Sequence, residues 1–346
     1  MAVALVVAGA GPRGLLWMGE VRDHPGFELA ACVDPDREAL ERAGEAHGVP
    51  ATRRFAGLEE ALAEVAADAA IVATPADRHV EACELALSRG LGVLVEKPFA
   101  LRLAEAVGVV RLAEERGAPL LVGQNLRYTR AHRTVRRLVR EGAIGRVGMA
   151  VAHYYHTPDH LPPSHAAMTN SILWGPVVHH MDALRYTLGS RVTGVVAQTF
   201  TTPWGPLPDG ASLQAMLTLE GDVHATYTAT YESKGHERFE GGQEFYERLV
   251  GERATLHVLN RWLVLCEPGR HPRWIRRGRR PRTEESILLN QLERALRDDS
   301  EPDASGRDNL ETVATMEACL ISASEGRWVD PGELLREAGA ERAPRD

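Results

Sequence analysis

Lys97 is the residue whose type and position most directly suggest chemistry. The apolar run at residues 92–95 predicts a buried strand of a parallel sheet, and Glu96, Lys97 and Pro98 follow it directly. Because Pro98 cannot continue the hydrogen-bond ladder, we expect Lys97 at the carboxyl end of the strand, where open α/β sheets bind ligands. Only two of the 40 Lys and Arg residues are lysines, Lys97 and Lys234. Since a partly desolvated lysine can exchange a proton and an arginine cannot, Lys97 is a candidate catalytic residue.

A second candidate for proton transfer is His179, near the start of a helix predicted over residues 178–188. The helical spacing places Asp182 and Tyr186 on the same face as His179. A histidine oriented by a carboxylate suits an acid/base role near neutral pH. The alternative, that His179 and Asp182 only cap the helix, is equally compatible with the pattern.

Histidines are frequent in this part of the chain, which raises the question of a metal. They are His153, His156, His160, His165, His179 and His180. Their spacings match no H-E-x-x-H pattern or similar set of ligands. We therefore expect no metal site.

The start of the chain has the pattern of a dinucleotide-binding loop. An apolar strand at residues 2–8 is followed by Gly9-Ala10-Gly11-Pro12-Arg13-Gly14 and a predicted helix at 15–22. This is G-x-G-x-x-G between a strand and a helix, where the glycines let backbone N–H groups approach a pyrophosphate. A second strand, residues 27–33, ends at Asp34, where a carboxylate would accept hydrogen bonds from the adenosine ribose.

Asp34 also bears on the choice of cofactor. A carboxylate at this position would repel a 2′-phosphate and so favours NAD. Arg37 is close enough in sequence to soften that repulsion, and NADP therefore stays open.

Thr74 and Pro75 have the pattern of a helix start. Thr74 is predicted as the N-cap, Pro75 as the first helical residue and Asp77 as an acid in the first turn. His79 would lie in the same turn. Capping explains Thr74 by itself, although the segment is also expected beside Lys97 at the edge of the sheet.

Strands and helices alternate through the first 122 residues, which predicts a doubly wound parallel sheet in a dinucleotide-binding domain spanning residues 1–122. The further strands are expected at 69–73, 92–95 and 120–122, and the further helices at 37–46, 58–65, 77–88 and 103–116.

From residue 123 onward, the pattern changes to alternating strands joined by short turns. This predicts a second, α+β domain at residues 123–346 with a large, mostly antiparallel open sheet. Its strands are expected at 147–151, 191–198, 212–219, 223–230, 253–259 and 262–266, and its helices at 130–141, 178–188, 284–298 and 307–325.

Composition limits the classes of partner. A net charge of −8 gives no general attraction to nucleic acid or anionic membranes, and the arginine-rich segment 270–282 is interpreted as an exposed loop. The four cysteines (Cys32, Cys83, Cys266 and Cys319) are widely spaced and predict free thiols. The chain has neither a basic leader segment nor an apolar stretch of 18 residues, so we expect a cytoplasmic protein.

These motifs together resemble the glucose–fructose oxidoreductase/inositol dehydrogenase (Gfo/Idh/MocA) family. The resemblance covers nearly the whole chain. It rests on the glycine-rich loop, Asp34, Thr74-Pro75 with His79, Glu96-Lys97-Pro98, a linker strand expected at 123–128, His179 with Asp182 to Tyr186, and the turn 302–308. Glu-Lys-Pro in this position is its most specific part.

The resemblance implies a Rossmann domain, a second domain often used to form homo-dimers or homo-tetramers, and hydride transfer between a nicotinamide and a carbinol carbon. Lys97 would hydrogen-bond the reacting hydroxyl, and His179 would be the acid/base. Cofactor contacts would come from the loop 9–14, Asp34 and a group at the nicotinamide side. This group comprises Thr74, Pro75, His79, Glu96 and Lys97. Substrate contacts would come from Arg127, Tyr128, Tyr155, Trp174, His180 and Asp182.

One departure from the family pattern concerns the substrate. The family commonly has D-x-G-x-H-x-x-D, and here the first position is Gly175. Asn170, His180 or Tyr155 would take the place of that carboxylate, or the substrate is not a plain polyol, or activity is lost.

The leading hypothesis is an NAD(P)-dependent dehydrogenase or reductase for a secondary alcohol or ketone of a sugar, cyclitol or related polar ring. Two alternatives stay open. One is a nicotinamide-binding sensor or partner protein without turnover, and the other is an enzyme that uses resident NAD in a closed oxidation–reduction cycle.

Overall fold

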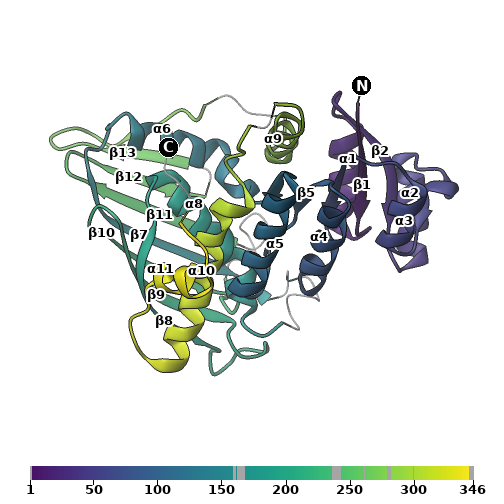
Figure 1. The fold of residues 1–346 in the computed structure, drawn as a ribbon. Helices are drawn as coiled ribbons and strands as arrows, with labels where there is room; N and C mark the ends of the chain where they lie inside the picture. The colour runs from purple at the N-terminus through teal and green to yellow at the C-terminus, as the bar shows by residue number, and fades with distance from the viewer. Residues whose placement is uncertain are drawn as a thin grey trace. The chain divides into compact units, whose positions relative to one another are not determined.

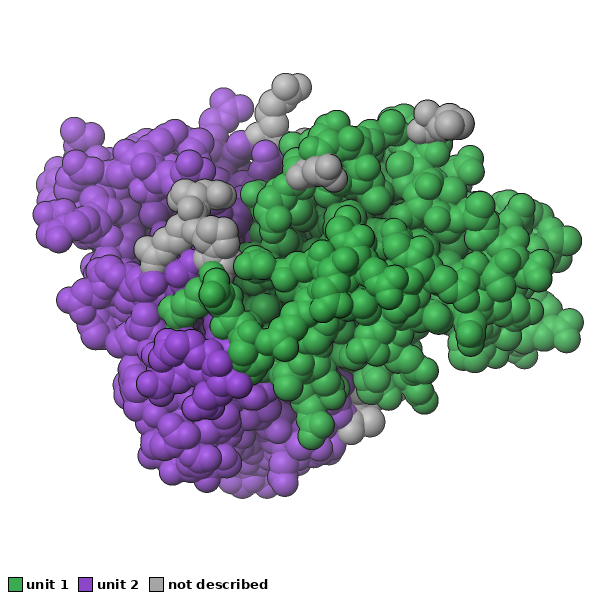
Figure 2. Space-filling view, viewed as in Figure 1, with its two compact units in different colours: residues 1–125, 281–313, 338–346 green, residues 126–280, 314–337 purple. Residues whose placement is uncertain are grey.

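The computed structural model describes residues 2–158, 161, 168–235, 243–260, 262–278, 282–298 and 300–342. The chain forms two compact units (Figure 2). The first contains residues 1–125, 281–313 and 338–346, and the second contains residues 126–280 and 314–337.

The first unit is built on a six-stranded sheet in the order β3-β2-β1-β4-β5-β6, and all of its pairings are parallel (Figure 1). This confirms the doubly wound parallel sheet. The strands are β1 (Val3–Ala8), β2 (Phe27–Val33), β3 (Arg54–Phe55), β4 (Ala69–Val72), β5 (Gly92–Val95) and β6 (Leu120–Val122).

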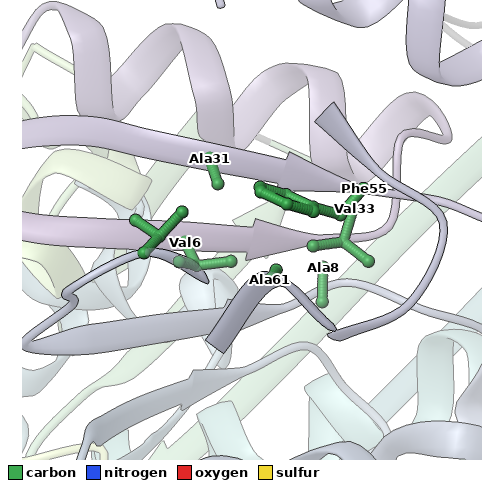
Figure 3. Packing of buried hydrophobic residues seen from close by; sticks show 7 residues of the cluster. Val6, Ala8, Ala31, Val33, Phe55 and Ala61 are labelled. Atoms are coloured by element: carbon green, nitrogen blue, oxygen red, sulfur yellow. The ribbon is translucent and has the colours of Figure 1, made fainter. Parts of the chain in front are cut away.

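Apolar side chains explain why these strands stay together. β4 and β5 are buried at every position, as expected for strands covered on both faces. One core cluster joins Val6 and Ala8 of β1 to Ala31 and Val33 of β2 and to Phe55 of β3 (Figure 3). Burying an aliphatic or aromatic side chain contributes about 1.5–3 kcal/mol, so such clusters fix the strand order.

Helices alternate with the strands of the first unit. They are α1 (Pro12–Arg22), α2 (Arg37–His47), η1 (Ala51–Arg53), α3 (Leu58–Glu64), η2 (Ala76–Arg78), α4 (His79–Ser88) and α5 (Leu103–Arg116). The ends of α2 follow local chemistry. The Asp36 side chain accepts hydrogen bonds from the backbone N–H groups of Glu38 and Ala39, and Gly48 ends the helix in the left-handed conformation.

The C-terminal segment that returns to the first unit was predicted as part of the second domain. α9 (Glu284–Asp298) and the start of α10 (Gly306–Glu325) belong to the first unit. Leu288 and Leu289 of α9 are fully buried, and Ala304 accepts a hydrogen bond from the N–H of Val122 in β6. The two-domain division at residue 122 is therefore corrected, because α9 has an apolar face that packs on the first unit.

The second unit contains an eight-stranded sheet in the order β14-β13-β12-β11-β7-β10-β9-β8. Its pairings are antiparallel except for β7 with β10, which confirms a large, mostly antiparallel sheet. The strands are β7 (Val147–His156), β8 (Val192–Phe200), β9 (Ser212–Leu219), β10 (Val223–Thr230), β11 (Gln243–Gly251), β12 (Thr255–Leu259), β13 (Trp262–Cys266) and β14 (Arg273–Trp274).

The sheet of the second unit has one buried and one more exposed face. Along β10, buried positions alternate with more exposed ones, the pattern of a sheet with one face packed. The helices of this unit are η3 (Asn125–Tyr128), which begins at the unit boundary, α6 (Arg130–Arg140), η5 (Leu173–Val177), α8 (Val178–Leu188) and α11 (Pro331–Glu337).

Several local predictions differ from the structure. β11 and α11 were not predicted, and β7 continues to His156 rather than ending at residue 151. The segment 123–128 was expected as a linker strand and instead contains η3. A π-helix, η5, precedes α8 because Pro176 lies inside the turn and cannot donate a backbone hydrogen bond.

The cysteines are free, as predicted, and three of the four are buried. Burial raises the pKa of the Cys32 thiol to about 11 and that of Cys319 to about 12. Among the described helices, none has the length and hydropathy needed to cross a bilayer.

Candidate active site

The glycine-rich loop between β1 and α1 is held by close backbone contacts. Gly9 has φ +104°, and a Cβ there would lie 2.4 Å from the carbonyl oxygen of Ala73. A Cβ on Gly14 would lie 1.8 Å from the carbonyl oxygen of Gly9. These two glycines are therefore required by packing between the strand and the helix.

Gly11 differs from the other two glycines because it borders open space. Within the described residues, a Cβ built on Gly11 meets no atom within 4 Å. Gly11 is also the N-cap of α1, where no described side chain accepts a hydrogen bond from the first turn, and Pro12 follows it. Uncapped N–H groups at a helix N-terminus beside open space fit the pyrophosphate of a dinucleotide.

Asp34 follows β2 and contacts the glycine-rich loop directly. Its carboxylate accepts hydrogen bonds from the backbone N–H of Ala10 at 2.6 Å and from that of Asp36 at 2.8 Å. The two contacts fix the carboxylate at the edge of the loop, the place predicted for contact with the ribose of NAD.

Thr74 was predicted as a helix N-cap, and this was wrong. The segment first forms η2, and α4 begins at His79 with Arg78 as its N-cap. The Thr74 hydroxyl is buried and has no hydrogen-bond partner among the described residues. A buried hydroxyl that lacks a partner next to Gly9 fits a polar group of the cofactor.

His79 was predicted to contact the cofactor, whereas its ring is occupied by the protein. Its Nδ1 lies 2.8 Å from the carbonyl oxygen of Pro98, and its Nε2 lies 2.9 Å from that of Thr74. Burial lowers the pKa of His79, so the ring is neutral near pH 7. His79 therefore ties the turn after β4 to the segment that contains Lys97.

Glu96 is part of a buried network that reaches the glycine-rich loop. Its Oε1 accepts hydrogen bonds from Arg13 Nε and Trp17 Nε1, both at 2.7 Å. Arg13 also lies 3.2 Å from Glu285 of α9, which accepts a hydrogen bond from the Asn125 side chain at 2.8 Å. Glu96 was expected at the nicotinamide side, and the structure shows its carboxylate engaged by the loop and α1.

Lys97 lies at the carboxyl end of β5, as predicted, and is half-buried. Desolvation lowers the pKa of its ammonium from 10.5 to about 8, while Glu96 opposes this shift and Arg13 adds to it. An ammonium with a pKa near the working pH can both accept and release a proton.

In the second unit, α8 carries His179 and His180, both half-buried. His180 Nδ1 is hydrogen-bonded to the Tyr227 hydroxyl, and the ring stacks on Phe245 with centroids 4.7 Å apart. Burial raises the pKa of Tyr227 well above its usual range, so the hydroxyl stays protonated.

Arg127 and Asp182 were predicted to contact substrate, but they bind each other. Asp182 accepts two hydrogen bonds from the Arg127 guanidinium, one of them from Nε at 2.7 Å. Arg127 is 3% exposed and Asp182 is 0% exposed. This ion pair joins η3 to α8.

The other predicted substrate contacts are dispersed within the second unit. Tyr128 and Trp174 are buried, the former against Tyr186. The ring centroids of Tyr154 and His180 are 5.0 Å apart, whereas the ring of Tyr155 stacks on that of His153. Because neighbouring strand residues point to opposite faces, Tyr155 lies on the face away from His180. His160 and His165 lie outside the described residues.

A cavity of about 390 Å³ is lined in part by Tyr155, on that second face of the sheet. Its strand residues Tyr155, Thr230, Ser212 and Phe200 form one row across β7, β10, β9 and β8. Within the described residues, no group of three or more His, Cys, Asp or Glu side chains is arranged to hold a metal.

Sequence reasoning missed Trp17, Glu285 and Tyr227. Trp17 has the spacing of an ordinary core residue of α1, and Glu285 is 272 positions away from its partner Arg13. Tyr227 belongs to a predicted alternating strand, whose inward positions are apolar or aromatic. Trp17 and Tyr227 could have been identified as polar contacts, because a buried Trp N–H or Tyr O–H usually has a hydrogen-bond partner.

Comparison with known proteins gives matches over both units. The family model described as "Oxidoreductase family, NAD-binding Rossmann fold" matches residues 3–124, and the GFO/IDH/MocA C-terminal domain matches residues 132–257. D-apiose dehydrogenase of Paraburkholderia graminis is 30% identical over 340 residues, which span 92% of this chain and 87% of that protein. Inositol 2-dehydrogenase of Leifsonia xyli subsp. xyli is 32% identical over 191 residues, or 55% of this chain and 54% of that protein.

Among solved structures, an oxidoreductase from Agrobacterium radiobacter in complex with NAD+, L-tartaric acid and magnesium has the same fold. Its TM-score is 0.86 at 24% identity, and the match covers 97% of this chain and 100% of that chain.

Proposed function

The chain belongs to the Gfo/Idh/MocA family of oxidoreductases with an NAD-binding Rossmann fold, and on that premise we propose that it oxidises a secondary alcohol of a sugar or cyclitol, or reduces the matching ketone. The observation that carries the proposal is Lys97, whose ammonium has a pKa of about 8 at the end of β5 beside the glycine-rich loop. The relatives named for D-apiose and inositol support a polyhydroxylated substrate.

The residues that would hold NAD lie in the first unit. The N–H groups of α1 and the open space at Gly11 suit the pyrophosphate, and Asp34 suits the adenosine ribose. The buried hydroxyl of Thr74 suits a polar group of the nicotinamide end. When bound, the nicotinamide supplies a hydride acceptor or donor, and the protein supplies position and proton transfer.

Lys97 and His179 would handle the proton of the substrate hydroxyl. In the direction of oxidation, the hydroxyl proton passes to Nζ of Lys97 as the carbonyl forms, which requires the lysine to be neutral beforehand. A pKa of about 8 makes roughly a tenth of Lys97 neutral at pH 7, compared with fewer than one in a thousand for an ordinary lysine. His179 would pass that proton on to solvent, or return it during reduction.

The test combines cofactor titration with a lysine substitution. We expect NADH to quench protein fluorescence or gain emission on binding, more tightly than NADPH, and NAD+ to be reduced with D-apiose or myo-inositol as first substrates. K97R should retain NADH binding and lose at least about 100-fold in kcat, because arginine keeps the charge but cannot give up its proton. Activity near wild type in K97R would contradict the role of Lys97. Failure to bind either cofactor would contradict the proposed function itself.

A further inference from the structure

The network around Glu96 connects three segments of the first unit that are distant in sequence. Arg13 comes from the glycine-rich loop, Glu96 precedes Lys97, and Glu285 comes from α9. Glu96 and Glu285 are 4% and 6% exposed, so both carboxylates are nearly removed from water. Buried carboxylates of this kind require compensation by positive charge or hydrogen bonds.

Arg13 supplies that compensation for both carboxylates. Its Nε and Nη2 lie 2.7 Å and 2.5 Å from Glu96 Oε1, and its Nη1 lies 3.2 Å from Glu285 Oε1. Trp17 Nε1 donates to the same oxygen of Glu96 at 2.7 Å. The second oxygen, Oε2, accepts from the backbone N–H of Lys97 at 3.2 Å. The Glu96 carboxylate is thus held on the side of α1 and the glycine-rich loop.

The direction in which Glu96 is held matters for Lys97. A carboxylate that approaches an ammonium favours the protonated form, whereas a nearby guanidinium disfavours it. Both influences act on Lys97, with Glu96 raising its pKa and Arg13 lowering it. Arg13 thus contacts Glu96 directly and also acts on Lys97 by its own charge.

We propose that Arg13, held by Glu285 of α9, is a positioning residue for Lys97 that keeps the Glu96 carboxylate on the glycine-rich loop and so lets the lysine release its proton. The inference rests on the proposed function in that the freed amine would serve as the proton acceptor. It extends that function because Arg13 of the glycine-rich loop and Glu285 of α9 would both influence proton transfer at Lys97.

The neighbouring titratable groups of the first unit are consistent with this assignment. Besides Glu96, Arg13 and Glu285, the imidazole of His79 contacts the carbonyl of Pro98, which directly follows Lys97. Burial lowers the pKa of His79, so its ring adds no positive charge at the pH at which Lys97 titrates. Among the charged groups of the first unit, Glu96 raises the pKa of Lys97 and Arg13 lowers it.

The small number of lysines allows a direct test in the cofactor-free protein. Limiting acetic anhydride labels neutral amines, and peptide mass spectrometry after labelling at pH 6–11 reports the midpoint for each lysine. Lys234 is exposed and serves as the internal reference. We expect a midpoint near pH 8 for Lys97 in the wild type. R13M should raise it by about one pH unit, a tenfold loss of reactivity at pH 7.

Two further variants separate positioning from simple charge. R22M removes an arginine from the far end of the same helix and should leave the midpoint unchanged. E96Q removes the carboxylate that Arg13 is proposed to restrain, so R13M in the E96Q background should shift the midpoint by less than half as much. R13Q repeats the measurement with a polar side chain, and near-UV circular dichroism establishes that each variant is folded.

The inference is overturned if R13M leaves the Lys97 midpoint in place, or if its effect is equally large in the E96Q background. In the second case, Arg13 would act through its own charge only. Because labelling does not depend on turnover, the expected midpoints without dehydrogenase activity would contradict the proposed function and support this inference. Dehydrogenase activity together with an unshifted Lys97 midpoint in R13M would support the proposed function and contradict this inference.

Discussion

At the scale of the residue, the desolvated ammonium of Lys97 lowers the free energy of unfolding at neutral pH. Folding lowers its pKa from 10.5 to about 8, so the unfolded chain binds more protons between these two values. The free energy of unfolding should therefore rise with pH across pH 8–10.5, and below pH 8 the full penalty applies.

K97M removes this penalty. At pH 7 we expect the variant to be more stable than the wild type by about 1–3 kcal/mol, with its pH dependence between pH 8 and 10.5 reduced. Urea denaturation at pH 7 and pH 10 measures both quantities. K234M is the control, since Lys234 is exposed, and should change neither. A K97M protein less stable than wild type at pH 7 would contradict the desolvation of Lys97.

Substitution by alanine should weaken NADH binding at Gly11 and reduce the stability of the fold at Gly14. G11A places a methyl group in open space, so we expect thermal unfolding within about 2 °C of wild type but NADH affinity weakened at least about 100-fold, because the methyl occupies the phosphate site. G14A forces its Cβ against the carbonyl oxygen of Gly9 and should cost about 3 kcal/mol or more. Thermal melts and fluorescence titrations distinguish these outcomes, and tight NADH binding by G11A would rule out this site for the phosphates.

At the scale of the element, the pair of Arg127 and Asp182 fixes η3 against α8. Removing one partner from a fully buried ion pair leaves an uncompensated charge, which costs about 3–5 kcal/mol. D182N should therefore lower the thermal midpoint strongly, and R127M/D182L should recover most of the loss.

R137M is the matched control, because Arg137 pairs with Glu141 at the surface of α6, where such pairs contribute about 0–1 kcal/mol. The NADH affinity of the first unit should change little in R127M/D182L. An equal loss of stability in D182N and R137M would show that the buried ion pair contributes no more to stability than the surface pair.

Elements that local patterns determine were predictable from the sequence. The apolar runs of β1, β4 and β5 and the G-x-G-x-x-G loop gave the first sheet and the position of Lys97, because strand period and turn chemistry act over a few residues. The face on which Tyr155 lies was not predicted, because β7 was expected to end at residue 151 and the face of a strand residue depends on register. β11 was missed because Glu247 and Arg248 interrupt its apolar pattern.

Contacts between distant segments could not be predicted in the same way. Nothing near Glu285 marks it as the partner of Arg13, and the pairing of Arg127 with Asp182 depends on how η3 and α8 pack. Motif spacing identifies which residue types are suited to chemistry, whereas long-range packing decides which of them meet. For this reason the position of Lys97 at the carboxyl end of β5 was predicted correctly. In contrast, four polar residues proposed for the cofactor or substrate site have partners within the protein that were not predicted: Glu96, Arg127, His79 and Asp182.

At the scale of the whole molecule, the first unit depends on residues 281–313. Thr283, just before α9, donates a hydrogen bond to Glu20 of α1 at 2.8 Å, and Asn290 of α9 lies 3.2 Å from His24, which follows α1. A chain that ends at residue 280 loses these contacts and exposes the surface that Leu288 covers in the full chain.

We expect this truncated chain to bind the dye ANS and to lose its cooperative thermal transition, because apolar surface becomes exposed. We also expect it to bind NADH at least about 100-fold more weakly, because Arg13 loses its partner Glu285. Differential scanning calorimetry and fluorescence titration measure these effects against the full-length protein. A sharp transition and unchanged NADH affinity in the truncated chain would show that residues 1–125 are self-sufficient.

The return of α9 to the first unit also sets an order of events during synthesis. Arg13 leaves the ribosome early, but Glu285 is translated only after the entire segment 126–280. Arg13 and Glu285 are 272 positions apart, so at 5–20 residues per second that interval lasts roughly 15–55 s. During this time the nascent glycine-rich loop lacks Glu285, its buried partner, while the later segment already has its own sheet to assemble. The contact between Arg13 and Glu285 therefore forms only after the segment 126–280 has been translated, and a ribosome that stalls within that segment leaves the first unit without α9.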